Sequence, residues 1–430
     1  MRRAHHSWWE YIIRNFFSQM RLGSMKMTLP DSQEICYGVY DANSINADIR
    51  VKDIAFFRKT VLFGDVGFGE SFVDGDWETS DVFKVIAWMV LNIDACPALA
   101  YDRPGFNVFN LFWFIDRLAH STRRNTLNGS QRNIQEHYDL SNDFFALFLD
   151  PTRAYSCAYY RAPEMTLQQA QIEKYAQWCR KLRISSGDKV IEIGSGWGGF
   201  AVYAARNSGC HVTTVTISKE QFDYVKELVV REGLEGRVEV RLSDYRHLEG
   251  QFDKLISIEM IEAVGHHFLK DYIAVCQKLV RQDGILGIQG ILCPDHRYES
   301  FRKRADWTQK HIFPGSVLPS MARIMNTFQE TGTMGLLDYE DVTPFYSKTL
   351  LSWRENFRQN VDKMTAMGFN ASFIRKWEYY FSYCAAAFHM RNIHVAQMVF
   401  TRANHRALTN NVSYSNLGYS NGGYNYEILR

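Results

Sequence analysis

A glycine-rich segment is the part of the sequence whose residue types and spacing point most directly to chemistry. Residues 192–199 read Glu-Ile-Gly-Ser-Gly-Trp-Gly-Gly, and closely spaced glycines allow a backbone to turn sharply and to approach a ligand. Gly194, Gly196 and Gly199 fit the GxGxxG spacing of dinucleotide-binding loops. This pattern alone is a weak indication, so a nicotinamide dinucleotide and a different nucleoside both remain open.

Two details favour a nucleoside other than a dinucleotide. A dinucleotide fold places an acidic residue about 20 positions after the loop to hold a ribose hydroxyl, but Thr216 stands there. Glu192 lies just before the first glycine, where nucleoside-binding methyltransferases usually carry an acid, and Asp244 could accept a hydrogen bond from an adenine amine. The spacing therefore favours a nucleoside-binding methyltransferase, and a glycine turn without a ligand is the alternative.

The elements around this loop alternate between strands and helices. Strands are predicted at residues 189–193, 211–217, 237–242, 252–258 and 284–292, and helices at 200–207, 219–233 and 268–284. This alternation predicts an α/β fold with a mostly parallel, Rossmann-like sheet covered by helices on both faces. Ligands of such sheets bind beyond the carboxyl ends of the strands, so the chemistry should lie there.

The length of 430 residues predicts two or three domains. Residues 1–125 carry mixed signals, including a turn-rich segment at 63–81, and should form a small N-terminal α+β domain. Residues 130–405 hold the alternating elements and should form the methyltransferase domain. The Asn-, Ser- and Gly-rich residues 409–430 are too polar to bury a core, so we predict a disordered tail.

Composition excludes several classes of protein. Lys plus Arg (49) nearly balance Asp plus Glu (47), which argues against a nucleic-acid partner. The eight cysteines form no CxxC pair and no metal-ligand spacing, so we expect no disulfide framework, no metal site and a reducing, cytoplasmic location. No apolar run reaches the roughly 20 residues that a membrane-spanning helix needs.

Two basic segments suggest contact with a membrane surface. Residues 1–26 carry apolar side chains at helical spacing, and such an amphipathic helix either lies on an anionic bilayer or docks on its own domain. Residues 297–310 carry five basic side chains near Trp307, which suits phosphate headgroups or, alternatively, a solvated helix face. The aromatic residues of segment 374–392 should mainly pack in the core, and some of them could line an acyl tunnel.

Several segments together resemble the cyclopropane-fatty-acyl-phospholipid synthase family, which includes the mycolic acid cyclopropane synthases. The resemblance runs from about residue 130 to 405, and GESFVDGDW resembles the lipid-binding N-terminal domain of longer members. The segments that carry it are EHYDLSNDFFALFLDPTRAYSCAYY, VIEIGSGWGGF, VTISKEQ, SDYR, IEMIEAVG and IFPGSVLPS.

The resemblance implies a C-methyltransferase that uses S-adenosylmethionine. Its sulfonium carries positive charge beside the methyl group, so hydroxyls, backbone groups and aromatic faces suit it. The residues implied to surround it, together with Glu192, are Tyr155, Ser156, Gly194, Gly196, Thr216, Ser218, Gln221, Asp244, Tyr245 and Arg246.

The resemblance also implies how the reaction ends. An alkene attacks the methyl group, a carbocation results, and a bound bicarbonate removes a proton to close the cyclopropane. The implied ligands of bicarbonate are Cys157, Glu262, the backbone of Ile291, Tyr346 and a histidine, but Gln289 stands at the histidine position. An amide donates a hydrogen bond but carries no proton away, so Glu262 is the residue expected to orient the base or to take the proton.

These observations predict a cytoplasmic enzyme, peripherally associated with the inner face of the membrane, that converts a cis double bond of a phospholipid acyl chain into a cyclopropane. The alternatives are a methyl-branched or methylene product, a sphingolipid base or small amine as acceptor, and a non-catalytic lipid-binding protein. A homodimer is compatible with the sequence.

Overall fold

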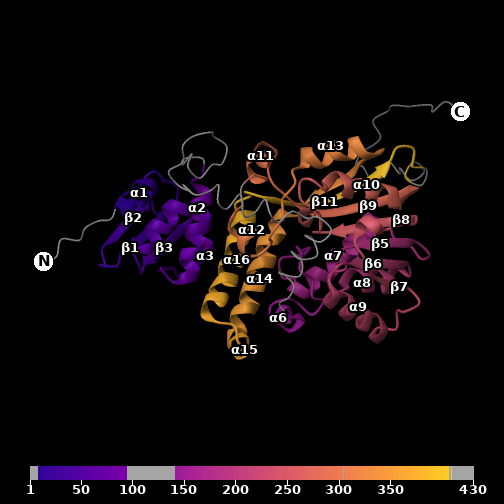
Figure 1. Ribbon diagram of the computed structural model, residues 1–430, viewed down its shortest axis with the longest axis horizontal. Helices are drawn as coiled ribbons and strands as arrows, with labels where there is room; N and C mark the ends of the chain where they lie inside the picture. Colours follow the sequence, from indigo (N-terminus) through magenta and orange to yellow (C-terminus); the bar gives the residue numbers. More distant parts are fainter. Residues whose placement is uncertain (1–7, 94–140, 304, 406–407, 409–430) are drawn as a thin grey trace, which may run out of the picture.

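The computed structural model describes residues 8–93, 141–303, 305–405 and 408. The predicted boundary between the two domains and the predicted tail at 409–430 lie outside the described residues. Figure 1 shows a small sheet with α1, α2 and α3 at one end of the molecule and a larger sheet at the other, with α14 and α16 between them.

The N-terminal unit combines a four-stranded sheet with three helices. The strand order is β2-β1-β3-β4, and only β1 and β3 pair in parallel. Helix α1 buries Ile13, Phe16 and Phe17, so its apolar face docks on its own domain. The elements are α1 (Trp8–Phe17), β1 (Ser24–Thr28), β2 (Glu34–Gly38), β3 (Asn46–Val51), α2 (Ala55–Asp74), β4 (Trp77–Glu78) and α3 (Val82–Leu91).

The segment predicted to be turn-rich at 63–81 is mostly helical, so that prediction was wrong. Gly64 does kink α2, with φ 59° and ψ −131°. Gly69 instead permits a close approach, because an added Cβ would lie 2.4 Å from Cδ1 of Trp307. A real turn comes at Gly75, which ends α2 with φ 86°. The glycines inside the helix serve packing rather than chain reversal.

The larger sheet has seven strands in the order β10-β11-β9-β8-β5-β6-β7. Neighbours from β9 to β7 pair in parallel, and β11 runs antiparallel to both β9 and β10. The predicted mostly parallel α/β sheet is therefore confirmed. The strands are β5 (Lys189–Ile193), β6 (His211–Thr216), β7 (Val238–Leu242), β8 (Phe252–Ile258), β9 (Val280–Leu292), β10 (Met334–Asp341) and β11 (His394–Arg402).

Helices cover both faces of this sheet. Val190 of β5 belongs to a buried cluster with residues of α7, α8 and α9, while the next residue, Ile191, packs with residues of α10 and α13. Alternate side chains of a strand point to opposite faces, so both faces are buried. The covering helices are α7 (Leu167–Lys181), α8 (Gly199–Ser208), α9 (Lys219–Arg231), α10 (Leu269–Leu279) and α13 (Met321–Thr331). Helix α6 (Asn142–Ala146) instead belongs to a separate buried cluster.

The helix predicted at 268–284 ends earlier than expected. It stops at Leu279, and Val280 already pairs with Phe252 as the first residue of β9. The longer prediction was wrong because strand pairing takes over residues whose own pattern fits a helix. The remaining elements are η1 (Tyr245–His247), η2 (Ile261–Ala263), η3 (Asp295–Arg297), α11 (Tyr298–Phe301), α12 (Trp307–His311), α14 (Thr343–Gln359), α15 (Val361–Ala366) and α16 (Ala371–His389).

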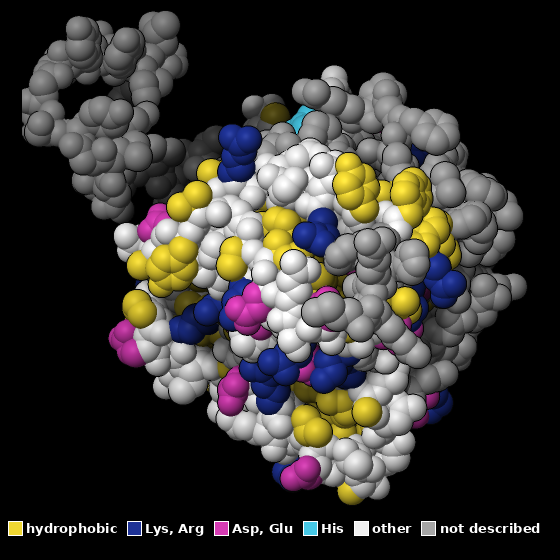
Figure 2. Space-filling view, turned by 90° about the vertical axis from the view of Figure 1, so that its left-hand side faces the viewer, with side chains coloured by type: hydrophobic (Ala, Val, Ile, Leu, Met, Phe, Trp, Pro, Cys, Tyr) yellow, Lys and Arg dark blue, Asp and Glu magenta, His cyan; other side chains and the backbone are white. Residues whose placement is uncertain are grey.

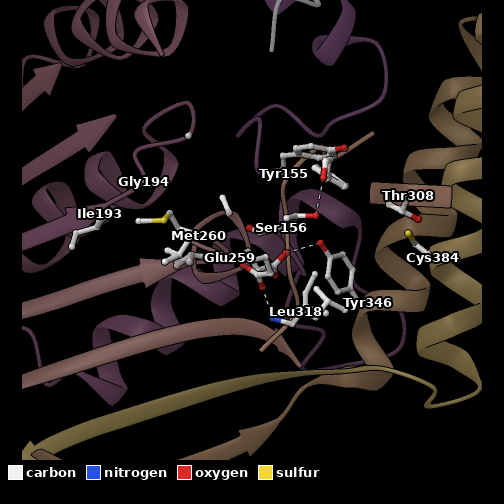
Figure 3. Close-up of a pocket in the computed structure, with 18 of the residues that line it drawn as sticks. Tyr155, Ser156, Ile193, Gly194, Glu259, Met260, Thr308, Leu318, Tyr346 and Cys384 are labelled. Atoms are coloured by element: carbon white, nitrogen blue, oxygen red, sulfur yellow. Dashed lines mark hydrogen bonds between the residues drawn. The ribbon is translucent and has the colours of Figure 1, made fainter. Parts of the chain in front are cut away.

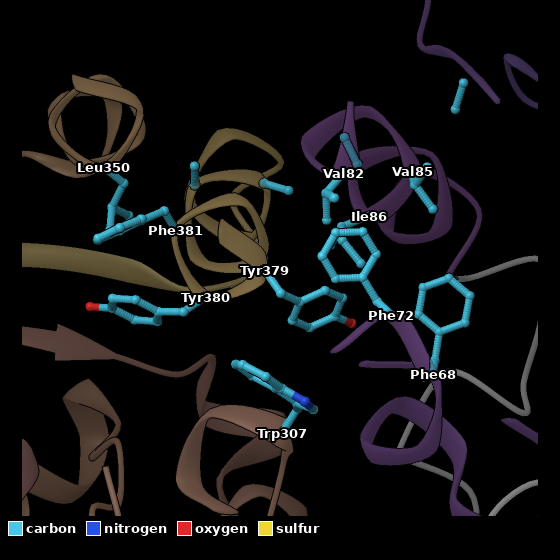
Figure 4. Packing of buried hydrophobic residues seen from close by; sticks show 14 of the residues in the cluster. Phe68, Phe72, Val82, Val85, Ile86, Trp307, Leu350, Tyr379, Tyr380 and Phe381 are labelled. Carbon is cyan, nitrogen blue, oxygen red and sulfur yellow. The ribbon is translucent and has the colours of Figure 1, made fainter. Parts of the chain in front are cut away.

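Helix α16 joins the N-terminal unit to the rest of the molecule. In Figure 4, Tyr379 of α16 lies between Trp307 of α12 and Phe72 of α2, with ring centroids 4.6 Å and 5.7 Å away. Arg375 adds hydrogen bonds to the carbonyls of Phe72 and Trp77. Among the described residues no helix is long and apolar enough to cross a bilayer.

Candidate active site

A cavity of about 400 Å³ opens beyond the carboxyl ends of β5, β6 and β8. One wall comes from the loops that follow these strands. The opposite wall comes from residues of α12, α14 and α16, and it is rich in aromatic side chains. The cavity therefore lies where the alternating pattern predicted the chemistry, and it joins a polar half to an apolar half.

The glycine loop between β5 and α8 forms part of the polar half. Gly194, Gly196 and Gly198 have φ values of 95°, 48° and 83°, which favour glycine over residues with a side chain. A Cβ added to Gly196 would meet no protein atom within 4 Å, and Gly196 lines the cavity. The space that a side chain at Gly196 would occupy is thus free for a ligand, and the loop fits a nucleoside cofactor.

The residues predicted to surround S-adenosylmethionine lie around this polar half, with one exception. Ser218 does not line the cavity. It instead caps α9, and its hydroxyl accepts a hydrogen bond from the backbone N–H of Gln221 at 3.3 Å. The predicted residues that line the cavity are Tyr155, Ser156, Glu192, Gly194, Gly196, Thr216, Gln221, Asp244, Tyr245 and Arg246.

Two polar pairs at the strand ends are ordered by the protein itself. Thr216 donates a hydrogen bond to Gln221 at 2.8 Å, and Thr214 donates to Glu192 at 2.5 Å. Burial raises the pKa of Glu192 to about 8. These side chains are therefore held in place at the end of β5 and β6 before any ligand binds.

Asp244 and Arg246 form an ion pair at the edge of the cavity. Oδ1 of Asp244 accepts from the backbone N and the Nε of Arg246, and Oδ2 lies 2.6 Å from its Nη2. Burial would raise the pKa of Asp244, but these hydrogen bonds outweigh burial and the pKa is lowered. The pair neutralises a guanidinium that would otherwise repel a sulfonium.

Glu259 stands at the centre of the cavity, directly after β8. Its Oε1 accepts hydrogen bonds from the Cys157 amide at 2.8 Å and from Nε2 of Gln289 at 2.7 Å, and its Oε2 accepts from the Tyr346 hydroxyl at 2.5 Å. Figure 3 shows Glu259 between Gly194 on one side and Tyr346 on the other. Three of the residues predicted to hold bicarbonate, Cys157, Gln289 and Tyr346, thus converge on a carboxylate of the protein.

The sequence analysis missed Glu259, although a signal for it was present. Glu259 is the first residue after the fourth strand of the predicted alternation, where ligands of parallel sheets bind. Glu262, which the sequence favoured on this argument, lies one turn later, in η2. Burial raises the pKa of Glu259, while hydrogen bonds from Tyr346, Gln289 and Cys157 oppose that rise.

Glu262 lines the same cavity but has fewer partners. Its Oε1 accepts from the backbone N of Ile291, while its buried Oε2 has no hydrogen-bond partner in the described part of the chain. Burial, followed by the charge of Glu259, raises its pKa to about 8. Glu259 has three donors against one for Glu262, so the negative charge of this pair belongs on Glu259.

Cys157 and Gln289 act on the site from behind the cavity wall. The Cys157 thiol donates to the carbonyl of Ala158 at 3.3 Å, and burial raises its pKa well above the usual range. The neutral thiol is no nucleophile. The Gln289 amide oxygen accepts from Trp178 and Gln397, both at 3.1 Å, which fixes its nitrogen toward Glu259.

A buried lysine that the sequence analysis did not single out supports the segment that holds Ser156 and Cys157. Lys174 of α7 donates to the Ser156 hydroxyl at 2.6 Å, and Gln171 donates to the Ser156 carbonyl at 2.9 Å. Burial lowers the pKa of Lys174 to about 8, against the attraction of Glu259 and other carboxylates. Helix α7 thereby fixes the backbone segment whose Cys157 N–H donates to Glu259.

The apolar half of the cavity is built from α14, α16 and the segments beside them. Tyr346 stacks on Phe388 with ring centroids 4.4 Å apart, and the hydroxyl of Tyr155 donates to that of Tyr380 at 3.0 Å. Segment 374–392 therefore both packs and lines the cavity, as predicted. The apolar and aromatic residues of this wall are Phe313, Tyr346, Leu350, Tyr380, Tyr383, Cys384, Ala387, Phe388 and Ile393.

The basic segment at 297–310 is arranged differently from an open cationic surface. Arg297 is buried and donates to the side chain of Asn392. Arg302 and Lys303 both pair with Glu299, and Lys310 pairs with Glu70 of α2 at 2.9 Å. These basic side chains are already engaged by the protein, which favours the alternative of an ordinary helical surface.

Comparison with known proteins identifies the family. The protein-family model described as mycolic acid cyclopropane synthetase matches residues 125–398. The chain belongs to this family. Its members are methyltransferases that use S-adenosylmethionine, and the chain is accordingly an S-adenosylmethionine-dependent methyltransferase with the fold of class I. The predicted family resemblance, fold class and enzyme class are therefore confirmed.

Relatives in this family modify lipids. The chain is 37% identical over 358 residues to the tuberculostearic acid methyltransferase UfaA1 of Mycobacterium tuberculosis, with 81% of each chain covered. It is 35% identical over 377 residues to the cyclopropane-fatty-acyl-phospholipid synthase of Escherichia coli, covering 85% of this chain and 90% of the relative. The structure of mycolic acid cyclopropane synthase CmaA1 with SAH and CTAB matches with a TM-score of 0.59 and 29% identity, over 63% of this chain and 98% of that one.

Proposed function

We propose that this enzyme transfers the methyl group of S-adenosylmethionine to a cis double bond in the acyl chain of a phospholipid and forms a cyclopropane. The observation that carries the proposal is the single cavity in which a glycine loop at the strand ends faces an apolar, aromatic wall. S-adenosylmethionine supplies an electrophilic methyl group. The role of the chain is to bring an alkene beside it, to exclude water and to accept one proton.

The polar half of the cavity suits the cofactor. Gly196 leaves room for close approach of a ligand, while Glu192 and the Thr216–Gln221 pair present oxygen atoms at the ends of β5 and β6. Hydroxyls and aromatic faces around Tyr155 and Ser156 surround the place where the methyl group would leave.

The apolar half suits an acyl chain and the cation that forms on it. The faces of Tyr346 and Phe388, which stack on each other, offer π electrons to a positive charge without reacting with it. Tyr380 and Tyr383 line the same wall. Because water would quench a carbocation, a wall built of rings and aliphatic side chains protects the reaction.

A methyl-branched or methylene lipid is the second candidate product. It is favoured by the 37% identity to a relative named tuberculostearic acid methyltransferase. The two outcomes share the methyl transfer and differ in which proton leaves the cation. Loss of a proton from the new methyl group closes the ring, whereas loss from a chain carbon leaves a methyl-branched alkene. A saturated branch would further require hydride from a separate reductase.

The test is turnover on defined vesicles. The protein is incubated with methyl-labelled S-adenosylmethionine and vesicles of a cis-monounsaturated phospholipid, with saturated and trans-unsaturated vesicles as controls. We expect S-adenosylhomocysteine and labelled lipid only with the cis lipid, and NMR of the product separates ring from branch. Label that enters no lipid, or enters saturated and unsaturated lipid equally, would refute the proposal.

We also propose that the N-terminal unit contacts the membrane surface from which the acyl chain enters. Figure 2 shows hydrophobic and basic side chains interspersed on the face at this end of the molecule. Trp8 and Tyr11 on α1 are 62% and 67% exposed, and amphipathic aromatic side chains favour the bilayer interface. Further exposed apolar residues of this unit are Leu22, Val39, Tyr40 and Ile54.

Co-sedimentation with vesicles tests this contact. Replacing Trp8 and Tyr11 together by Ser should weaken binding to anionic vesicles several-fold, and salt should weaken the wild type because surface charges are screened. Val230→Ser is the matched control, since Val230 is equally exposed, at 62%, on α9. Equal binding by wild type and the double variant would exclude α1 as the contact.

A further inference from the structure

The hydrogen-bond donors around Glu259 leave no place for a separate anion. Bicarbonate, which the family resemblance implied, is a small planar ion that requires donors on its oxygens. The backbone N–H of Cys157, the side-chain amide of Gln289 and the Tyr346 hydroxyl already donate to Glu259. The fourth implied donor, the backbone N of Ile291, donates to Glu262. The negative charge of Glu259 beside the same space would also repel an anion, so bicarbonate does not fit the residues present.

The backbone at Glu259 supports a dedicated role for its side chain. Glu259 has φ 50°, in the left-handed region that residues with a Cβ seldom adopt. Glycine would occupy this position without strain. A glutamate persists in such a conformation when surrounding contacts hold it there, and strained residues of this kind gather at functional sites. Here the three donors supply those contacts.

We propose that the carboxylate of Glu259 is the built-in base of this enzyme and replaces bicarbonate. The inference rests on the proposed function and names the group that completes it. Glu259 is partly accessible and lines the cavity between the glycine loop and the aromatic wall, where the new methyl group would lie. The three hydrogen bonds weaken it as a base, but a proton next to a carbocation is so acidic that a weak base is sufficient.

The step balances without a further reactant. The methyl carbon leaves the sulfur, which keeps the bonding pair and becomes the thioether of S-adenosylhomocysteine. The π pair of the alkene forms the new C–C bond, and the second alkene carbon becomes cationic. Glu259 takes a proton from the new methyl group, and the released C–H pair closes the ring. The proton on Glu259 is then returned to solvent.

Two variants and one surface control test this assignment. Glu259→Gly removes the base, relieves the positive φ and leaves the donors facing an empty space. Glu259→Gln keeps the shape but not the charge. Both should lose about 100-fold or more of the rate while calorimetry shows unchanged affinity for S-adenosylmethionine. Glu235→Gln, on the exposed surface, should retain the wild-type rate.

Rescue by small anions gives the decisive comparison. In buffer purged of carbon dioxide, the wild type should keep its rate, and Glu259→Gly should regain activity when bicarbonate or formate is added. Glu259→Gln should not respond, because its amide fills the space. A wild type that stops when bicarbonate is purged and recovers when it is returned would overturn the proposal, as would full activity of Glu259→Gly without added anion.

A binding measurement separates this inference from the proposed function. We expect ¹³C-bicarbonate NMR to show binding to Glu259→Gly and none to the wild type, whatever lipid is used. Bicarbonate binding of equal strength to both proteins would overturn the inference, even if lipid turnover is observed. Absence of lipid turnover in the wild type would refute the proposed function, while the binding comparison would still decide whether Glu259 occupies the anion site.

Discussion

Gly69 of α2 lies against the indole ring of Trp307 in α12, so closely that a Cβ on Gly69 would come within 2.4 Å of Cδ1 and 2.5 Å of Nε1. The two residues belong to opposite sides of the junction between the N-terminal unit and the cavity wall. Thr308, the next residue after Trp307, lines the cavity. The surface of the N-terminal unit therefore helps to position the wall of the active site.

Replacing Gly69 by Ala should destabilise the protein although alanine favours helices. The added methyl group must displace Trp307 or separate the two helices, and overpacking of this kind costs about 1–3 kcal/mol. We expect a lower melting temperature and a raised KM for lipid, with affinity for S-adenosylmethionine unchanged. Gly335→Ala, where an added Cβ meets nothing within 4 Å, is the control for both measurements. Unchanged stability and KM would show that the junction does not reach the cavity.

Gly196→Val should abolish binding of S-adenosylmethionine while the protein remains folded. The substituted side chain would enter the cavity rather than the protein, because nothing lies within 4 Å of its Cβ. The φ of 48° adds backbone strain of about 1–2 kcal/mol. Calorimetry measures the affinity and circular dichroism the fold, with Gly236→Ala, also in open space, as control. Wild-type affinity in a folded Gly196→Val protein would place the cofactor elsewhere.

Lys174→Met should shift the pH dependence of the rate. The ammonium of Lys174 lowers the pKa of Glu259 by its charge, so its removal raises that pKa. Less of the base is then ionised at a given pH, and the acidic limb of the kcat profile moves to higher pH. Lys181→Met on the same helix, where Lys181 pairs with Glu340 at 2.9 Å, should leave the limb in place. A uniform loss of kcat without a shift would indicate that Lys174 only supports the fold.

Glu262 should make the protein less stable as pH rises. Its pKa is raised to about 8 in the folded state, well above that of an unfolded glutamate. Between these two values the folded state binds more protons, so the free energy of unfolding falls with increasing pH. Glu262→Gln removes this titration. The free energy of unfolding of the variant should therefore rise by about 1–3 kcal/mol relative to that of the wild type between about pH 5 and pH 8.

Denaturant unfolding at several pH values, without cofactor, measures that difference. The exposed Glu235→Gln serves as the control and should follow the wild type at every pH. Parallel stability curves for Glu262→Gln and the wild type would mean that Glu262 titrates in the folded protein as it does in water.

The sequence by itself determined the features that depend on local pattern. The strand and helix alternation from 189 to 292 predicted the parallel sheet, because period and turn residues are local signals. The glycine loop at 192–199 predicted a nucleoside site at the end of the first strand, and the cavity lies there. The segments resembling a known family predicted the enzyme class that the comparisons then showed.

Only the tertiary structure decided which groups meet. Glu259 has three donors whose residues are numbered 157, 289 and 346, so no local pattern connects them. Gly69 appeared as a turn residue because its partner, Trp307, lies far along the chain. Arg302, Lys303 and Lys310 suited phosphate headgroups or a solvated helix face by sequence, but folding pairs them with Glu299 and Glu70. Hydrogen bonds, packing and ion pairs between distant segments are properties of the folded chain, and they determine which carboxylate can act as the base.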